Sequence, residues 1–121
     1  ETLIAIGNLA AALYRSDDFA AAEVAFREYV TLCDRIYQPR HPSCAERRNG
    51  LGKSLRELQR YPEAEAMLLE AHRLKSKVEG SQFVGPDKVA DELVVLYQRW
   101  GRDQSASEWA SKGSAAAAAE D

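Results

Sequence analysis

A phosphate-binding loop is the first chemistry that the sequence suggests. The stretch "NGLGKS", residues 49–54, ends in Gly52-Lys53-Ser54, the order of residues that closes such loops. The full motif also needs a glycine five residues before Gly52, because only glycine lets the backbone wrap so tightly around a phosphate. Position 47 is arginine, and the upstream "HPSCAERR" is charged and proline-broken where a buried strand should precede the loop. We therefore predict no nucleotide binding, with Gly52 serving a helix–helix contact and Lys53 facing outward.

A metal site is the second chemistry to consider. Cys33, His41 and Cys44 form the spacing C-x7-H-x2-C, and His72 is available as a fourth ligand. This spacing matches no zinc pattern, because zinc sites pair their ligands on tight turns. Two cysteines are also too few for a disulfide framework. We expect a buried Cys33 on a helix, a linker His41, an incidental Cys44, a solvated His72, and no metal or other cofactor.

Enzymatic chemistry has no other sequence signal. There is no nucleophile elbow, no H-E-x-x-H and no dinucleotide fingerprint. The net charge of −3 disfavours nucleic-acid binding, which needs a basic surface. No apolar run approaches the roughly 20 residues of a membrane span, and no signal peptide is evident. We predict a non-enzymatic cytoplasmic domain without nucleic-acid or membrane partners.

Internal repetition is the strongest pattern in the chain. Residues 6–26, 48–68 and 90–110 align without gaps at a constant offset of 42. Small residues coincide at one position and large apolar residues at others, in the sets Ala22/Ala64/Ala106, Leu9/Leu51/Leu93, Leu13/Leu55/Tyr97, Phe26/Leu68 and Phe19/Tyr61. Such a period indicates stacked units that cannot bury their apolar faces alone.

Each unit is predicted to hold two antiparallel helices. Apolar residues recur at helical spacing on both sides of a short polar break, and proline-bearing connectors separate the units. The predicted helices cover residues 2–15, 18–36, 43–58, 61–79, 86–100 and 103–112. The fold class is therefore all-α, a right-handed superhelix of three units at 1–42, 43–84 and 85–113. Residues 114–121 are an alanine-rich tail that either extends the last helix or is a linker.

These residues resemble the tetratricopeptide repeat. Leu51, Gly52, Leu55, Tyr61, Ala64, Leu68 and Ala71 follow that family's pattern in order and spacing. The period of 42, "HP" at 41–42 and the "NLAAALY" opening look more like the kinesin-light-chain subtype than the 34-residue form. The third unit departs from the pattern at Asp103 and Ala110, which suggests a terminal unit with Trp109 covering the core. The "LVVLYQRWGR" and "SEW" segments are similar to the closing unit of arrays in large bacterial signalling proteins, including serine/threonine kinases.

The resemblance implies a partner site on the concave surface, which the first helix of each unit lines. Carried over by position, the partner-binding residues are Asn8, Tyr14, Arg15, Asn49, Lys53, Arg56, Lys88, Gln98 and Arg99, with Ala11 and Glu46 among further exposed positions there. Asparagine amides suit a peptide backbone because they donate and accept hydrogen bonds at once. The basic residues favour an acidic peptide. Asn49, Lys53 and Arg56 are expected to form the centre of the groove.

Two functions of different classes are consistent with this pattern. One is a protein–protein interaction module that binds an extended peptide in the groove. The alternative is a structural spacer or self-association segment of a larger multidomain protein, such as a signalling kinase.

Overall fold

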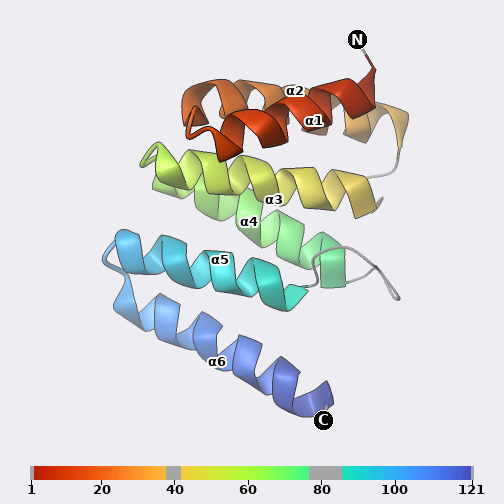
Figure 1. Ribbon diagram of the computed structural model, residues 1–121. Coiled ribbons are helices and arrows are strands. Elements are labelled where there is room, and N and C mark those ends of the chain that lie inside the picture. The colour runs from red at the N-terminus through yellow and green to blue at the C-terminus, as the bar shows by residue number, and fades with distance from the viewer. Residues whose placement is uncertain (1, 38–41, 77–85, 121) are drawn as a thin grey trace.

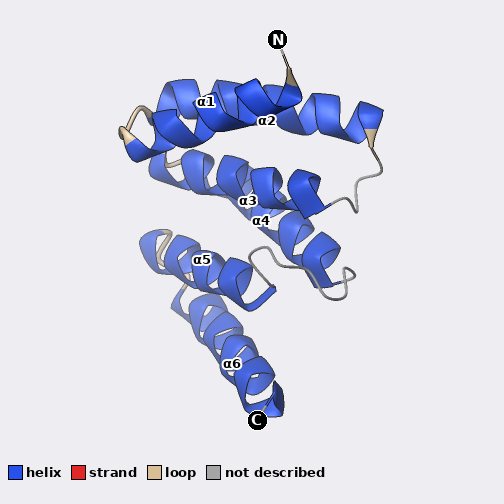
Figure 2. Cartoon of the chain, turned by 45° about the vertical axis from the view of Figure 1, so that its right-hand side comes forward, coloured by secondary structure: helices blue, strands red, loops and turns tan. Residues whose placement is uncertain are grey.

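The protein is a stack of three antiparallel helix pairs (Figures 1 and 2). The computed structural model describes residues 2–37, 42–76 and 86–120. The helices are α1 (Leu3–Arg15), α2 (Phe19–Ile36), α3 (Pro42–Glu57), α4 (Tyr61–Ser76), α5 (Pro86–Arg99) and α6 (Asp103–Glu120). Within the described ranges there is no strand, so the prediction of an all-α repeat solenoid is confirmed.

The turn inside each pair repeats the same backbone geometry. Asp17, Gln59 and Gly101, spaced 42 residues apart, all have positive φ angles, of 62°, 62° and 76°. In each turn the residue after this one donates its N–H to a carbonyl five residues earlier, as Arg60 does to Leu55 over 2.9 Å. Glycine occupies this left-handed conformation freely, whereas the other two side chains accept some strain. The backbone conformation of the turn therefore recurs every 42 residues, as the residue types do.

Small residues let the two helices of each pair approach closely. Ala22, Ala64 and Ala106 are all buried, and Ala64 has no exposed surface. Gly52 is equally confined, since a Cβ added there would lie 2.6 Å from Leu68 Cγ. Because "NGLGKS" lies inside α3, its backbone N–H groups are committed to the helix and cannot form a phosphate loop. The prediction that Gly52 serves a helix–helix contact is confirmed.

One predicted core position is wrong. Leu51 and Leu93 are almost completely buried, but the aligned Leu9 is 51% exposed. Leu51 and Leu93 lie on α3 and α5, and each of these helices packs against the second helix of the preceding unit. Within the described residues no such helix precedes α1, so Leu9 remains uncovered together with Ile4.

A disulfide joins the first two units and corrects the prediction of an incidental Cys44. Cys33 near the end of α2 and Cys44 in the first turn of α3 are bonded, with a Cα–Cα distance of 5.7 Å. Both residues are fully buried, in a small cluster with Ile6 and Tyr29. His41, the third member of the spacing, lies outside the described residues. Two thiols that are bonded to each other cannot serve as metal ligands.

The third unit closes the core with aromatic residues. Trp109 packs against the main core, as predicted for a terminal unit, and its ring meets His72 edge-on at 4.9 Å between centroids. His72 is therefore half-buried, not simply solvated as expected, and burial lowers its pKa, with a further lowering from Lys112. Tyr97 donates to Glu65 across 2.8 Å, joining α5 to α4.

Helix ends agree with the prediction except at α6. Its backbone continues through the alanine run to Glu120, beyond the predicted end at residue 112. Alanine has the highest helix propensity, which accounts for the extension. The predicted helical residues 77–79 lie outside the described part, and the unit boundaries remain predictions.

A larger side chain at position 64 tests whether α3 and α4 approach each other closely. Ala64→Leu should lower the free energy of unfolding by roughly 1–3 kcal/mol, because the fully buried site has no space for three more carbons. Ala66→Leu is the matched control, since Ala66 is exposed on the same helix. Chemical denaturation of both variants measures the difference, and equal stabilities would contradict this packing.

Reduction tests the disulfide. Dithiothreitol should lower the free energy of unfolding by about 2–3 kcal/mol, because the bond restricts the unfolded chain across a separation of 11 residues. A Cys44→Ala variant should not respond to the reductant. Two free thiols in the native, unreduced protein, measured by thiol titration, would show that the bond is absent.

Candidate functional site

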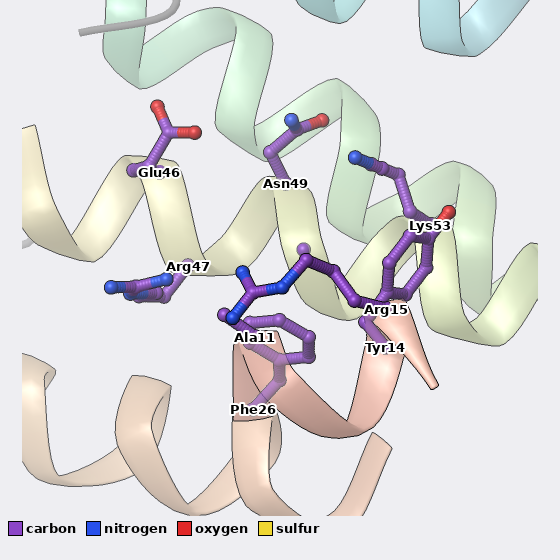
Figure 3. Close-up of a pocket in the computed structure, with 9 residues that line it drawn as sticks. Ala11, Tyr14, Arg15, Phe26, Glu46, Arg47, Asn49 and Lys53 are labelled. Carbon is purple, nitrogen blue, oxygen red and sulfur yellow. The ribbon is translucent and has the colours of Figure 1, made fainter. Parts of the chain in front are cut away.

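The candidate site is a pocket between the first helices of units one and two. We call the surface formed by α1, α3 and α5 the first-helix face. A cavity of about 280 Å³ opens there, lined by Ala11, Tyr14, Arg15, Phe26, Glu46, Arg47, Asn49, Gly50 and Lys53 (Figure 3). Four of the nine predicted partner-binding residues line it: Tyr14, Arg15, Asn49 and Lys53.

Phe26 reaches the pocket from the second layer because α3 carries a glycine above it. A Cβ at Gly50 would lie 2.6 Å from the Phe26 ring, so any larger residue would displace the ring. Phe26 itself is almost completely buried in the main core. The base of the pocket is therefore apolar and firmly packed.

Asn49 places an unsatisfied amide at the pocket. Its side chain is only 5% exposed, and among the described residues its Oδ1 has no hydrogen-bond partner. A buried polar atom without a partner costs roughly 1–3 kcal/mol, so the arrangement is unfavourable in the free protein. Because this oxygen has almost no accessible surface, a bound group would remove the cost only by supplying a donor after the amide turns toward the pocket.

Three cations surround the same pocket. The Lys53 ammonium lies 4.8 Å from the centre of the Tyr14 ring, and the Arg47 guanidinium lies 5.5 Å from that of Tyr29. Arg15 is exposed at the end of α1 and extends across the pocket opening toward α3 (Figure 3). The aromatic rings position Lys53 and Arg47 without neutralising their charge.

Arg56 does not belong to this pocket, and its expected place at the exposed centre of the groove is wrong. It is 5% exposed, and its Nη1 donates to the Glu92 carboxylate over 2.8 Å and to the Glu92 carbonyl over 3.3 Å. Helical spacing places Arg56 on the same side of α3 as Lys53, but α5 covers that end. Arg56 therefore links α3 to α5.

A second ion pair extends the link between α3 and α5. Arg99, another predicted site residue, is exposed and donates to Glu57 of α3 over 2.5 Å. Tyr14 lies between this charged region and the pocket, with Arg56, Glu57, Glu92 and Arg99 all influencing its titration. Burial raises the pKa of Tyr14, so its hydroxyl stays protonated and can both donate and accept.

The remaining predicted residues lie on the first-helix face but outside the pocket. Asn8 on α1 and Lys88 and Gln98 on α5 are exposed. Sequence analysis missed three of the lining residues: Phe26, Arg47 and Gly50. Arg47 aligns with Ala5 of α1, which is not an expected contact position, so no repeat-based signal marked it.

Other classes of site find no support in the described part of the chain. Its residues contain no group of three histidine, cysteine, aspartate or glutamate side chains able to hold a metal ion. None of the helices searched there is both long and apolar enough to span a membrane.

Two substitutions one turn apart on α3 test the assignment of Arg56 and Lys53. Arg56→Ala should lower the free energy of unfolding by roughly 1–3 kcal/mol, because it leaves Glu92 without its buried donor. Lys53→Ala should change stability far less, since it removes only a cation–π contact at a half-exposed site. Thermal or chemical unfolding distinguishes them, and equal effects would place Arg56 at the surface.

Comparison with known proteins agrees with this architecture. The family model for the tetratricopeptide repeat matches residues 1–77, which include the four helices that build the pocket and its support. No curated protein matches the chain. Repeats of this family supply interaction surfaces for other proteins. The chain belongs to the tetratricopeptide-repeat family.

Proposed function

We propose that this protein binds an extended peptide segment of a partner along the first-helix face, at the pocket between α1 and α3. The observation that carries the proposal is the Asn49 amide, which lines the pocket and leaves a buried oxygen unpaired. An extended peptide presents unpaired N–H and C=O groups, which an amide can bind in both senses. The protein acts as a non-enzymatic interaction module.

The charge of the pocket favours an acidic segment. Arg15, Arg47 and Lys53 supply three positive charges, whereas Glu46 supplies the only carboxylate of the lining. Glu46 is itself bound by Lys75 of α4, so its charge is compensated from behind the pocket. An acidic residue of the partner would replace water as the counter-charge of these cations.

The subtype of the repeat and the cellular compartment of the protein are further proposals. The period of 42 residues supports a kinesin-light-chain-like array, and the closing unit supports the C-terminal part of a longer bacterial array. The predicted cytoplasmic location stays a prediction, and the disulfide between Cys33 and Cys44 weighs against it. Disulfides persist in oxidising compartments and are rare in the cytosol.

Affinity capture with matched variants tests the groove. Asn49→Ala should weaken binding of a captured partner about fivefold, because it removes hydrogen bonds worth roughly 1 kcal/mol. Lys53→Glu should weaken binding further, and its effect should shrink as salt rises, because salt screens exposed charges. Pull-down from the native lysate, followed by titration of the captured protein, measures both effects.

Arg73→Glu is the control for the second variant. It makes the same charge reversal at an exposed site on α4, in the second layer of helices. We expect it to retain all partners. If the Asn49 and Lys53 variants retain the same partners at the same affinities, the pocket is not the binding surface.

The alternative function is a spacer or self-association segment. The exposed apolar side chains of Ile4 and Leu9 favour it, because another helix packed against α1 would bury them. The spacer function replaces peptide binding if the capture experiment finds no dependence on the pocket.

A further inference from the structure

We infer that the pocket between α1 and α3 recognises a phosphorylated side chain of the bound segment, a dianion and not a simple carboxylate. This inference rests on the proposed function, because it names the group that the peptide would place in the pocket. It is carried by an uncompensated cluster of charge, by the space beside that cluster and by the donors that surround it.

The charges of the pocket differ from those of the rest of the chain. Ion pairs with carboxylates engage most of the described arginines, namely Arg27, Arg48, Arg56, Arg60, Arg73 and Arg99. Among the described residues, no carboxylate forms an ion pair with Arg15, Arg47 or Lys53. The pocket is thus lined by three cations that form no ion pair, and its one carboxylate, Glu46, is paired with Lys75.

The fold fixes the positions of Arg47 and Lys53. Arg47 lies against α1 because Gly7 has no side chain there: a Cβ at Gly7 would be 3.2 Å from Arg47 Nε and 2.9 Å from the Tyr29 ring. Lys53 rests on Tyr14, and Arg15 extends from α1 toward Arg47 (Figure 3). Like charges held near one another repel, and a bound anion removes that repulsion.

The number of charges and donors favours a phosphoryl group. A carboxylate brings one negative charge and two oxygens, which a single guanidinium can satisfy in a bidentate pair. A phosphorylated serine, threonine or tyrosine brings a charge of about −1.5 to −2 and three acceptor oxygens. The guanidinium groups of Arg15 and Arg47, which Figure 3 shows toward the same end of the pocket, carry two positive charges and more N–H donors than one carboxylate can accept.

Two small probes separate a phosphoryl from a carboxylate. N-acetyl-phosphoserine amide and N-acetyl-glutamate amide are titrated into the full chain at constant ionic strength, with binding followed by backbone amide shifts in NMR. We expect the phosphoserine probe to bind at least tenfold more tightly and to shift signals around Arg15, Arg47 and Asn49. Equal affinity for the two probes would overturn the inference.

Variants locate the binding. Arg15→Gln and Arg47→Gln should each weaken binding of the phosphoserine probe at least fivefold, whereas Arg73→Gln, outside the pocket, should not. Arg15 is exposed, so its variant should fold normally even if Arg47→Gln disturbs the contact with Tyr29. Unchanged binding by the Arg15 variant would also overturn the inference.

Phosphatase treatment distinguishes this inference from the proposed function. Treating the lysate before capture should remove partners that wild type retains from untreated lysate. If capture depends on Asn49 but survives phosphatase, peptide binding stands and phosphoryl recognition fails. If capture depends on neither, both fail.

Discussion

Close approach of the two helices within each pair is the constraint on which the rest of the structure depends. Alanine at 22, 64 and 106 and glycine at 52 place no large side chain at the helix–helix contact, so the second layer lies directly behind the first. That distance brings Phe26 of the second layer to the base of a pocket on the first-helix face. It also brings Lys75 behind α3, where it compensates Glu46. The shape and charge of this pocket therefore depend on packing in the second layer of helices.

The two junctions of the first-helix face differ in electrostatics although they share one backbone geometry. Between α3 and α5, Arg56 and Arg99 are bound to Glu92 and Glu57, so that junction is internally neutral. Between α1 and α3, Arg47 and Lys53 have aromatic neighbours in place of carboxylates. An ion pair fills a junction and holds its helices together, whereas cations without partners leave it open to a ligand. The same repeated backbone thus forms a junction closed by ion pairs between α3 and α5 and a junction with an open pocket between α1 and α3.

Sequence predicted the helices, the turns and the small contact residues because each of these recurs in every unit. It failed where neighbouring units differ. Leu9 aligns with Leu51, but alignment does not reveal whether another helix covers the position. Arg56 was predicted to be exposed because helical spacing shows on which side of α3 a residue lies. That spacing does not show that α5 covers this part of α3. The Cys33–Cys44 bond depends on how the end of α2 meets the start of α3, which spacing along the chain does not specify.

The disulfide also changes how the chain would respond to mechanical load. A force applied to the two ends of the chain can unfold α2 up to Cys33 and α3 from Cys44 onward. The residues between the two cysteines carry no load, because the tension passes through the disulfide. The 11 residue steps they enclose would span roughly 36–40 Å when extended, against 5.7 Å across the bond. An oxidised chain pulled to full length is therefore shorter than a reduced one by on the order of 30–35 Å. In a stretched array, the redox state of one bond would set both the reach of the chain and the part of it that stays folded.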